Sequence, residues 1–228
     1  MSMKPQLSDV GLWWRWVLCT ISGFLIGNVF GIPASLVGLY FLGPTLQSFG
    51  FCRQNILATG CIIFGAILIG AIVFGAAIGY LQWFVVRKLT KRSGWWILAS
   101  TVGWTVVAIA LGELAYMPVS GVIGNLDGSF EEVSFLVHLP ALAMATVWVA
   151  FSGLLLGILQ WLILRRSLPR SMWWIGVNVG LMLAAAIAVI PILRGETRLL
   201  SLLFFFIGFL PIYAVVTGAA IVKIRQGS

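Results

Sequence analysis

Six long apolar segments, separated by short polar segments, account for most of the chain. They cover about residues 12–30, 56–86, 95–116, 140–164, 173–193 and 199–222. A helix needs roughly 20 apolar residues to cross the hydrocarbon core of a bilayer, which is about 30 Å thick. The pattern therefore predicts six transmembrane helices, with Pro140 in the first turn of the fourth, where proline is well tolerated.

The first apolar segment has no clear end. Residues 31–51 remain apolar but contain Pro33, Gly43 and Pro44, so they fit a continued helix, a helix lying on the membrane surface or a re-entrant piece. The segment 56–86 is longer than a bilayer core requires, which predicts a tilted helix or an overhang outside the membrane.

The composition agrees with a membrane location. The 228 residues are 61% hydrophobic and 9% charged, and the mean hydropathy is +1.09, whereas a soluble domain has about 25% charged residues. The 11 Trp and 26 Gly are typical of membrane proteins, in which Trp favours the interface and Gly is common in spanning helices. We expect an all-α polytopic transmembrane helical bundle that forms one domain over residues 1–228.

Basic residues are distributed unequally between the two ends of the predicted helices. Three of them, Arg53, Arg194 and Arg198, fall at one end and eleven at the other. Cytoplasmic loops carry the excess of Lys and Arg, so we predict a bacterial inner membrane protein with both termini in the cytoplasm. This topology explains the net charge of +8 better than nucleic acid binding does. The eleven residues are Lys4, Arg15, Arg87, Lys88, Lys91, Arg92, Arg165, Arg166, Arg170, Lys223 and Arg225.

An internal repeat covers the two central turns. Residues 75–97 read GAAIGYLQWFVVRKLTKRSGWWI and residues 153–175 read GLLLGILQWLILRRSLPRSMWWI, with 11 of 23 positions identical at a constant offset of 78. Duplications of this length mark repeated structural units. Each unit here is the end of one helix, a basic turn and the start of the next helix.

The repeat predicts a bundle of parallel helical hairpins, related by an axis along the membrane normal. Their ranges are about 12–88, 95–166 and 173–225. The first and last parts of the chain provide a weaker third copy, in which Trp13–Trp14 is the counterpart of Trp95–Trp96 and Trp173–Trp174.

Small and polar residues of the repeat fall on one face of each helix, because their spacing follows the helical period. Glycines there allow a neighbouring backbone to come close, and a glutamine amide in hydrocarbon needs a partner, so we expect each Gln to point into the bundle and bond across helices. The alternative is that both Gln residues line a polar pathway. The residues are Gly75, Gly79 and Gln82, matched by Gly153, Gly157 and Gln160.

Aromatic and basic residues of the repeat are expected at the cytoplasmic interface. Together with the three Trp pairs, Trp83 and Trp161 are interpreted as an aromatic belt at the lipid headgroups. The adjacent basic residues would reach anionic headgroups. These are Arg87, Lys88, Arg165 and Arg166.

Glu113 is the one acid within a predicted span. It lies 18 residues after Trp95, or roughly 27 Å along a helix with a rise of 1.5 Å per residue, which places it near the far interface. We interpret it as an interfacial acid, paired with Arg194 or Arg198, with a proton or ion role as the alternative. Its counterpart in the repeat is Pro191, so the repeat does not predict a paired site.

The sequence contains no recognised catalytic, metal or cofactor motif. Cys19, Cys52 and Cys61 form no CxxC pair, and His138 is the only histidine. Six acids and one His leave few groups for acid–base catalysis. We therefore expect a protein that is not an enzyme and carries no cofactor.

The repeated pattern GxxxGxxQWxxxRR, followed by a Trp that opens the next span, resembles uncharacterised multi-pass membrane proteins of cyanobacteria and related bacteria. It runs from Gly75 to Trp95, with Lys88 at the second basic position, and again from Gly153 to Trp173. With the flanking helices it covers about a third of the chain. The resemblance implies no activity, and it makes a thylakoid membrane the alternative location if the source is photosynthetic.

Three functions remain open from sequence. The first is a structural or accessory subunit that packs with other membrane proteins or with itself, within the lipid bilayer. The second is a small transporter or channel with a path lined by Gln82 and Gln160. The third is binding of a pigment or a lipid on the aromatic surface.

Overall fold

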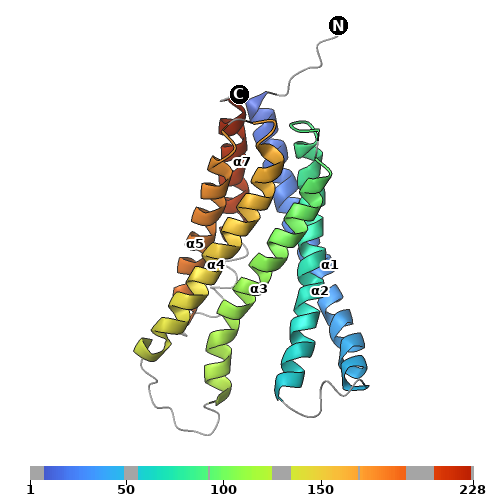
Figure 1. Cartoon of the computed structure of the whole chain (residues 1–228), viewed down its shortest axis with the longest axis vertical. Helices are drawn as coiled ribbons and strands as arrows, with labels where there is room; N and C mark the ends of the chain where they lie inside the picture. Colours follow the sequence, from blue (N-terminus) through green and yellow to red (C-terminus); the bar gives the residue numbers. More distant parts are fainter. Residues whose placement is uncertain are drawn as a thin grey trace.

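Six helices form the regular structure of the described residues (Figure 1). The computed structural model describes residues 8–48, 56–91, 93–124, 135–168, 170–193 and 208–226, with side chains except at 42–48, 56–61, 63, 111–124, 135–142 and 189–193. The helices are α1 (Asp9–Ser48), α2 (Ile56–Val86), α3 (Trp95–Gly124), α4 (Phe135–Leu164), α5 (Trp173–Leu193) and α7 (Leu210–Gln226).

Two helices have the predicted limits, three differ from them, and α1 is the helix for which the sequence predicted no clear end. The helices α2 and α5 coincide with the apolar runs 56–86 and 173–193, and α3 continues past residue 116 to Gly124. The placement of Pro140 in a first turn is wrong, because the mostly apolar residues before it extend α4 back to Phe135. Of the expected helix 199–222, residues 199–207 lie outside the described residues, and α7 ends at Gln226.

The helix α1 resolves the ambiguity of the first apolar segment. It is one helix of 40 residues, so residues 31–48 continue the helix through Pro33 and Pro44 rather than forming a separate surface or re-entrant piece. Residues 49–51 lie outside the described part. At 1.5 Å per residue the helix is about 60 Å long, which is about twice the thickness of a hydrocarbon core.

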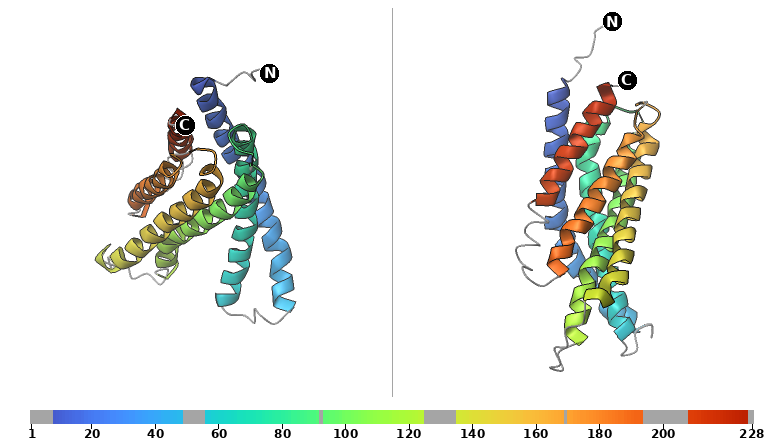
Figure 2. Two further views of the ribbon diagram at one scale, coloured as in Figure 1. Left: turned by 45° about the horizontal axis from the view of Figure 1, so that its top comes forward. Right: turned by 90° about the vertical axis from the view of Figure 1, so that its left-hand side faces the viewer.

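The helices form a closed ring of neighbours. Contacts join α1 to α2, α2 to α3, α3 to α4, α4 to α5, α5 to α7, and α7 back to α1. The start of α1, the end of α7 and the described residues of the two turns, 87–91 with 93–94 and 165–168 with 170–172, lie at one end of the molecule, which we call the turn end (Figures 1 and 2). Away from it, α1 and α2 diverge from α3 and α4 (Figure 2), so the bundle is closed at the turn end and splayed at the opposite end.

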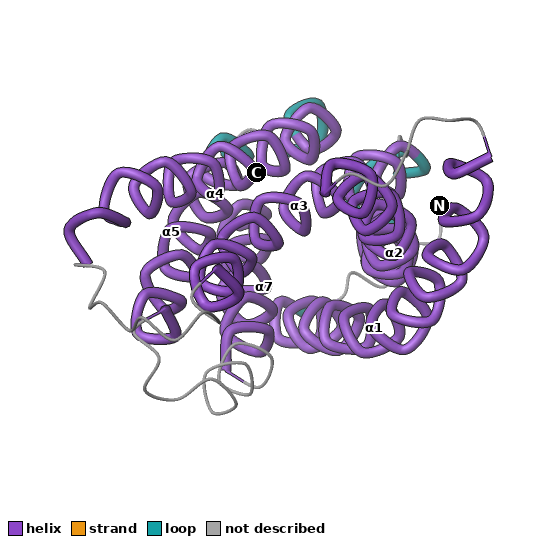
Figure 3. Tube along the Cα trace, turned by 90° about the horizontal axis from the view of Figure 1, so that it is seen from below, coloured by secondary structure: helices purple, strands orange, loops and turns teal. Residues whose placement is uncertain are grey.

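Within the part of the chain that the structure describes, three helical segments are long and apolar enough to cross a bilayer. They are Asp9–Phe41, Phe64–Val86 and Ala143–Leu164. Two further apolar segments, Trp95–Ala110 and Trp173–Ala188, are shorter within the part of the chain whose side chains are described. The helices stand side by side when viewed end-on (Figure 3), as helices do in a bundle.

Candidate functional site

Three tryptophans meet inside the turn end. Trp16 of α1, Trp96 of α3 and Trp174 of α5 are all fully buried. Their ring centroids lie 5.9 Å apart for Trp16 and Trp96, 5.5 Å for Trp16 and Trp174, and 6.0 Å for Trp96 and Trp174. Aromatic pairs at such distances contribute about 0.5–1.5 kcal/mol each beyond the area they bury. This cluster, which we call the tryptophan triad, joins three helices that are not consecutive in the chain.

The triad corrects the interpretation of the Trp pairs as an interfacial belt. Trp95 is 64% exposed and Trp173 is 72% exposed, whereas their neighbours Trp96 and Trp174 are fully buried. Consecutive helical residues point about 100° apart, at 3.6 residues per turn, so only one residue of each pair can face outward. The belt interpretation is therefore wrong for the second residue of these two pairs.

The predicted counterpart in the first helix is also wrong. Trp14 is 52% exposed, and Trp16 occupies the triad position instead. The sequence places two aromatic residues together at Trp13 and Trp14, which suggested a match with the other pairs. In the structure, the residue of α1 that corresponds to Trp96 and Trp174 is Trp16, two residues after Trp14.

Gln82 and Gln160 each connect three helices. The Nε2 atom of Gln82 donates to Thr20 Oγ1 on α1 over 3.2 Å, and its Oε1 atom accepts from Trp96 Nε1 on α3 over 3.2 Å. Gln160 donates to Ser100 Oγ on α3 over 3.0 Å and accepts from Trp174 Nε1 on α5 over 2.8 Å. Both glutamines are buried, so each amide uses its two polar ends within the bundle.

Sequence reasoning missed Thr20 and Ser100, which accept these glutamine bonds, whereas Asn178 accepts from Tyr213 instead. Thr20, Ser100 and Asn178 each follow a triad tryptophan by four residues and are all fully buried. Residues four apart share a helical face. A Trp followed four residues later by Thr, Ser or Asn was therefore the pattern that could have predicted these buried polar residues. The pattern occurs once in each of α1, α3 and α5 and extends the correspondence to α1.

Where α7 joins α5 and α1, two side chains take the place that one glutamine has in α2 and in α4. Tyr213 of α7 donates to Asn178 Oδ1 over 2.8 Å, and Thr217 Oγ1 accepts from Trp16 Nε1 over 3.0 Å. The Thr217 side chain is too short to span both contacts as a glutamine does, and Tyr213, one turn earlier, reaches α5. The hydrogen bonds thus run from α1 through α2, α3, α4, α5 and α7 and back to α1.

The glycines of the repeat lie where α2 and α4 meet the next helix. A Cβ atom on Gly79 would lie 3.1 Å from the Ile97 Cα atom, and one on Gly157 would lie 2.9 Å from the Ile175 Cα atom. One turn earlier, a Cβ on Gly75 would meet the Thr101 backbone at 2.9 Å. Gly153 has the corresponding place, with Met182 side-chain atoms at 2.6 Å. The missing side chains let these helices approach closely enough for the glutamines to bond.

A second set of glycines brings α1 against α2. A Cβ on Gly23 would lie 2.8 Å from the Ile78 Cα atom, and one on Gly27 would lie 2.8 Å from the Phe74 ring. A Cβ on Gly31 would lie 2.9 Å from the carbonyl oxygen of Gly70. This contact extends along α1 well beyond the tryptophan triad.

The basic turns carry stacked arginines. The Arg87 guanidinium lies 5.0 Å from the Trp83 ring and 4.8 Å from the Phe84 ring, and Arg165 lies 5.2 Å from the Trp161 ring. Trp83 also donates to Ser93 Oγ over 3.2 Å. Lys88 and Arg166, like the two arginines, are exposed at this end. The charged groups therefore lie outside the ring, with aromatic faces beneath them.

Several residues singled out from sequence lie outside the described side chains. These are Cys61 of α2, Glu113 of α3 and His138 of α4, and the residues that lie outside the described part altogether are Lys4, Cys52, Arg53, Arg92, Arg194 and Arg198. Among the described residues, His, Cys, Asp and Glu form no group of three or more that could hold a metal ion. The buried polar groups of the ring are neutral amides, hydroxyls and indoles, whose chemistry is hydrogen bonding between helices.

None of the protein-family models, curated proteins or solved structures compared with this chain matches it.

Proposed function

We propose that this chain is a non-enzymatic integral membrane protein that crosses the bilayer six times. Three described helices have sufficient length and hydropathy, and their outward faces carry apolar side chains such as Leu25, Val29 and Val147, which are 62%, 65% and 67% exposed. Apolar surface of this extent is costly in water and favourable in lipid. The two shorter apolar segments and α7 complete the six spans.

In this proposal the turn end faces the cytoplasm of a bacterial inner membrane. It holds Lys88, Arg166 and Lys223, which are exposed, and the positive-inside rule places such ends in the cytoplasm. The buried tryptophan triad lies directly inside the same end. The splayed opposite end then faces the periplasm, or the lumen if the membrane is a thylakoid.

We further propose a structural or accessory role, in which the protein packs with other membrane proteins or with itself. The observation that carries this role is the closed ring of hydrogen bonds. Gln82 and Gln160 have both polar ends bonded and are only 1% and 0% exposed. A side chain that lines a transport path must meet the solute, so these glutamines favour a fixed scaffold over a path.

The test compares the wild type with the double variant Q82L/Q160L in proteoliposomes. We expect no flux of potassium, protons or amino acids above that of empty liposomes for either protein. A tagged wild-type chain is expected to purify from native membranes in a constant ratio with a membrane partner or with a second copy. Flux by the wild type that the double variant loses, while its helix content is retained, would overturn the accessory role.

A further inference from the structure

A cavity of about 280 Å³ lies between α1, α2, α3 and the start of α7. Its walls are mostly aromatic and aliphatic and include Phe24, Phe74, Trp104 and Val107, with Asn28 as a polar member. None of the described residues that line it is charged. The cavity therefore favours a neutral and mainly apolar occupant.

Trp104 is the unusual residue of this cavity. Its side chain is 2% exposed, and its Nε1 atom is buried without a hydrogen-bond partner among the described residues. The indole lies against Phe24 and Tyr213, with centroids 5.1 Å away in both cases. A buried donor without an acceptor costs about 1–3 kcal/mol. The buried tryptophans of the triad all have acceptors, so Trp104 differs from them.

The depth of Trp104 limits what can supply the acceptor. It follows Trp95 by nine residues, or about 13 Å along α3 at 1.5 Å per residue. In the proposed membrane placement this is close to the middle of a hydrocarbon core about 30 Å thick. Water is scarce there, and the ester carbonyls of phospholipids lie nearer the interface. A molecule dissolved in the hydrocarbon can reach this depth.

We propose that the cavity binds a neutral, mainly apolar molecule with one accepting oxygen, a carbonyl or an ether, that takes the Trp104 hydrogen bond. An apolar cavity of about 150 Å³ in another protein holds one benzene ring, so this cavity has room for about two rings. Asn28 donates one of its two amide N–H groups to the Phe24 carbonyl over 2.8 Å, whereas the single N–H of Trp104 has no acceptor among the described residues. The inference uses the membrane placement proposed above but not the accessory role.

The experiment compares benzophenone with diphenylmethane, which has the same two rings without the carbonyl. Saturable binding of each probe to the full chain is measured in lipid nanodiscs and corrected for partition into empty nanodiscs. We expect benzophenone to bind about 3- to 10-fold more tightly, which corresponds to a net hydrogen bond of about 0.5–1.5 kcal/mol. Irradiation of the bound benzophenone is expected to label α1 or α3 at residues such as Phe24 and Val107.

Two variants separate the hydrogen bond from the space. W104F removes the donor, and we expect the ratio of the two affinities to fall to about one. A108L places a larger side chain on the cavity wall and is expected to weaken both probes equally. Equal binding of the two probes to the wild type, an unchanged ratio in W104F, or labelling confined to lipid-facing residues outside the cavity would each overturn the proposal. A flux result does not bear on it.

Discussion

Trp174 Nε1 donates to Gln160 Oε1 over 2.8 Å, and 78 residues earlier Trp96 makes the same bond to Gln82 over 3.2 Å. In both cases the glutamine belongs to the helix that precedes the tryptophan, and its nitrogen is bonded to a hydroxyl on the helix before that. The same three-helix connection therefore occurs twice. Each tryptophan–glutamine bond joins the two helices that a basic turn connects, inside the turn end.

Replacing Gln160 with leucine is expected to destabilise the protein by about 1–3 kcal/mol. The change introduces an apolar side chain of similar size and leaves Trp174 Nε1 and the Ser100 hydroxyl without their partner, and a buried unpaired group costs about this much. The free energy of unfolding in bicelles, measured by steric trapping, checks the value. L162A is the control on the same helix, because Leu162 is 41% exposed.

A double-mutant cycle with W174F isolates the bond itself. W174F alone removes the donor and leaves the Gln160 oxygen unpaired, so it should cost more in the wild type than in Q160L. We expect a coupling energy of about 0.5–2 kcal/mol, as for hydrogen bonds between membrane helices. Additive effects of the two changes would show that the 2.8 Å contact contributes nothing to stability.

The limits of the helices were predictable where apolar runs end at charged or turn-forming residues. The run from Ile56 to Val86 stops at Arg87 and Lys88, and α2 has those limits. The start of α4 was not predictable from Pro140, because proline marks a first turn only when the residues before it disfavour a helix. Here they are mostly apolar and extend α4 to Phe135.

The inward position of the glutamines followed from the cost of an unpaired amide in hydrocarbon, but their partners did not. A single sequence shows that Gln82 needs a bond, and the identity of Thr20 depends on which helices are neighbours. The bonds made by α7 were harder still to predict, since Tyr213 and Thr217 together take the place of one glutamine and neither belongs to the repeated sequence. The cavity beside Trp104 arises from the divergence of whole helices, which no local pattern records.

Alanine at Gly157 is expected to destabilise the protein by about 1–3 kcal/mol, the usual cost of overpacking. Its methyl group would lie 2.9 Å from the Ile175 Cα atom, and backbone atoms cannot move aside as a flexible side chain does. Gly176 offers a matched control, because a Cβ there meets nothing within 4 Å. G176A should be neutral or slightly stabilising, since alanine favours helix more than glycine by about 1 kcal/mol. Equal effects of G157A and G176A would contradict the close helix contact.

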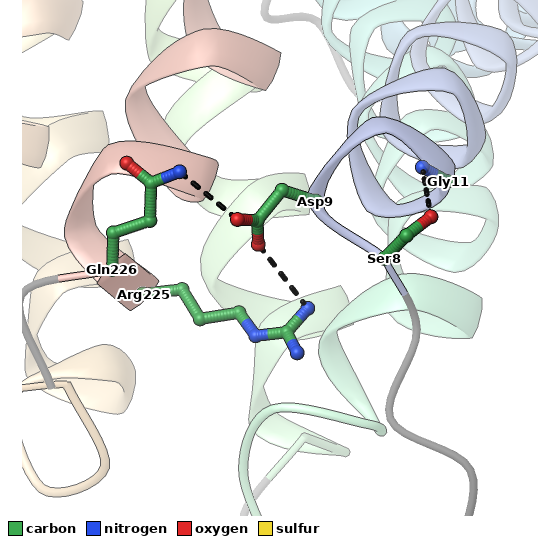
Figure 4. A network of polar contacts seen from close by, with 5 residues as sticks. All are labelled: Ser8, Asp9, Gly11, Arg225 and Gln226. Atoms are coloured by element: carbon green, nitrogen blue, oxygen red, sulfur yellow. Dashed lines mark hydrogen bonds and ion pairs between the residues drawn. The ribbon is translucent and has the colours of Figure 1, made fainter.

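The contact between the first and last helices combines a surface pair with a buried bond, and the two should differ in strength. Asp9 lies 3.8 Å from Arg225 and accepts from Gln226 Nε2 over 2.9 Å, beside the Ser8 hydroxyl that caps α1 (Figure 4). These groups are partly exposed, and pairs of this kind are worth about 0–1 kcal/mol. We expect D9N to change the free energy of unfolding by less than about 1 kcal/mol and to lose its effect in high salt.

T217V should cost more than D9N. Valine keeps the shape of threonine but leaves Trp16 Nε1 without the acceptor that lies 3.0 Å away in the buried part of the same contact, and the expected loss is about 1–3 kcal/mol. Steric trapping again gives the free energy of unfolding, now at low and high salt. The T217V effect should not depend on salt, because no charge is involved. A larger effect of D9N would mean that the surface pair, and not the ring of hydrogen bonds, joins α7 to α1.

The orientation of the turn end can be tested at Ser167. This residue is exposed in the turn between α4 and α5, and basic residues such as Arg165 and Arg166 flank it, so the positive-inside rule places it in the cytoplasm. In a chain whose three cysteines are replaced by alanine, S167C should react with a membrane-impermeant maleimide only after the inner membrane is permeabilised. Labelling in spheroplasts before permeabilisation would reverse the proposed orientation. A cysteine at Lys223, which is exposed near the end of α7, should behave identically, because an even number of spans brings the last helix back to the same side. Opposite labelling of the two positions would contradict six spans, since the chain must cross the membrane twice, through α5 and α7, between Ser167 and Lys223.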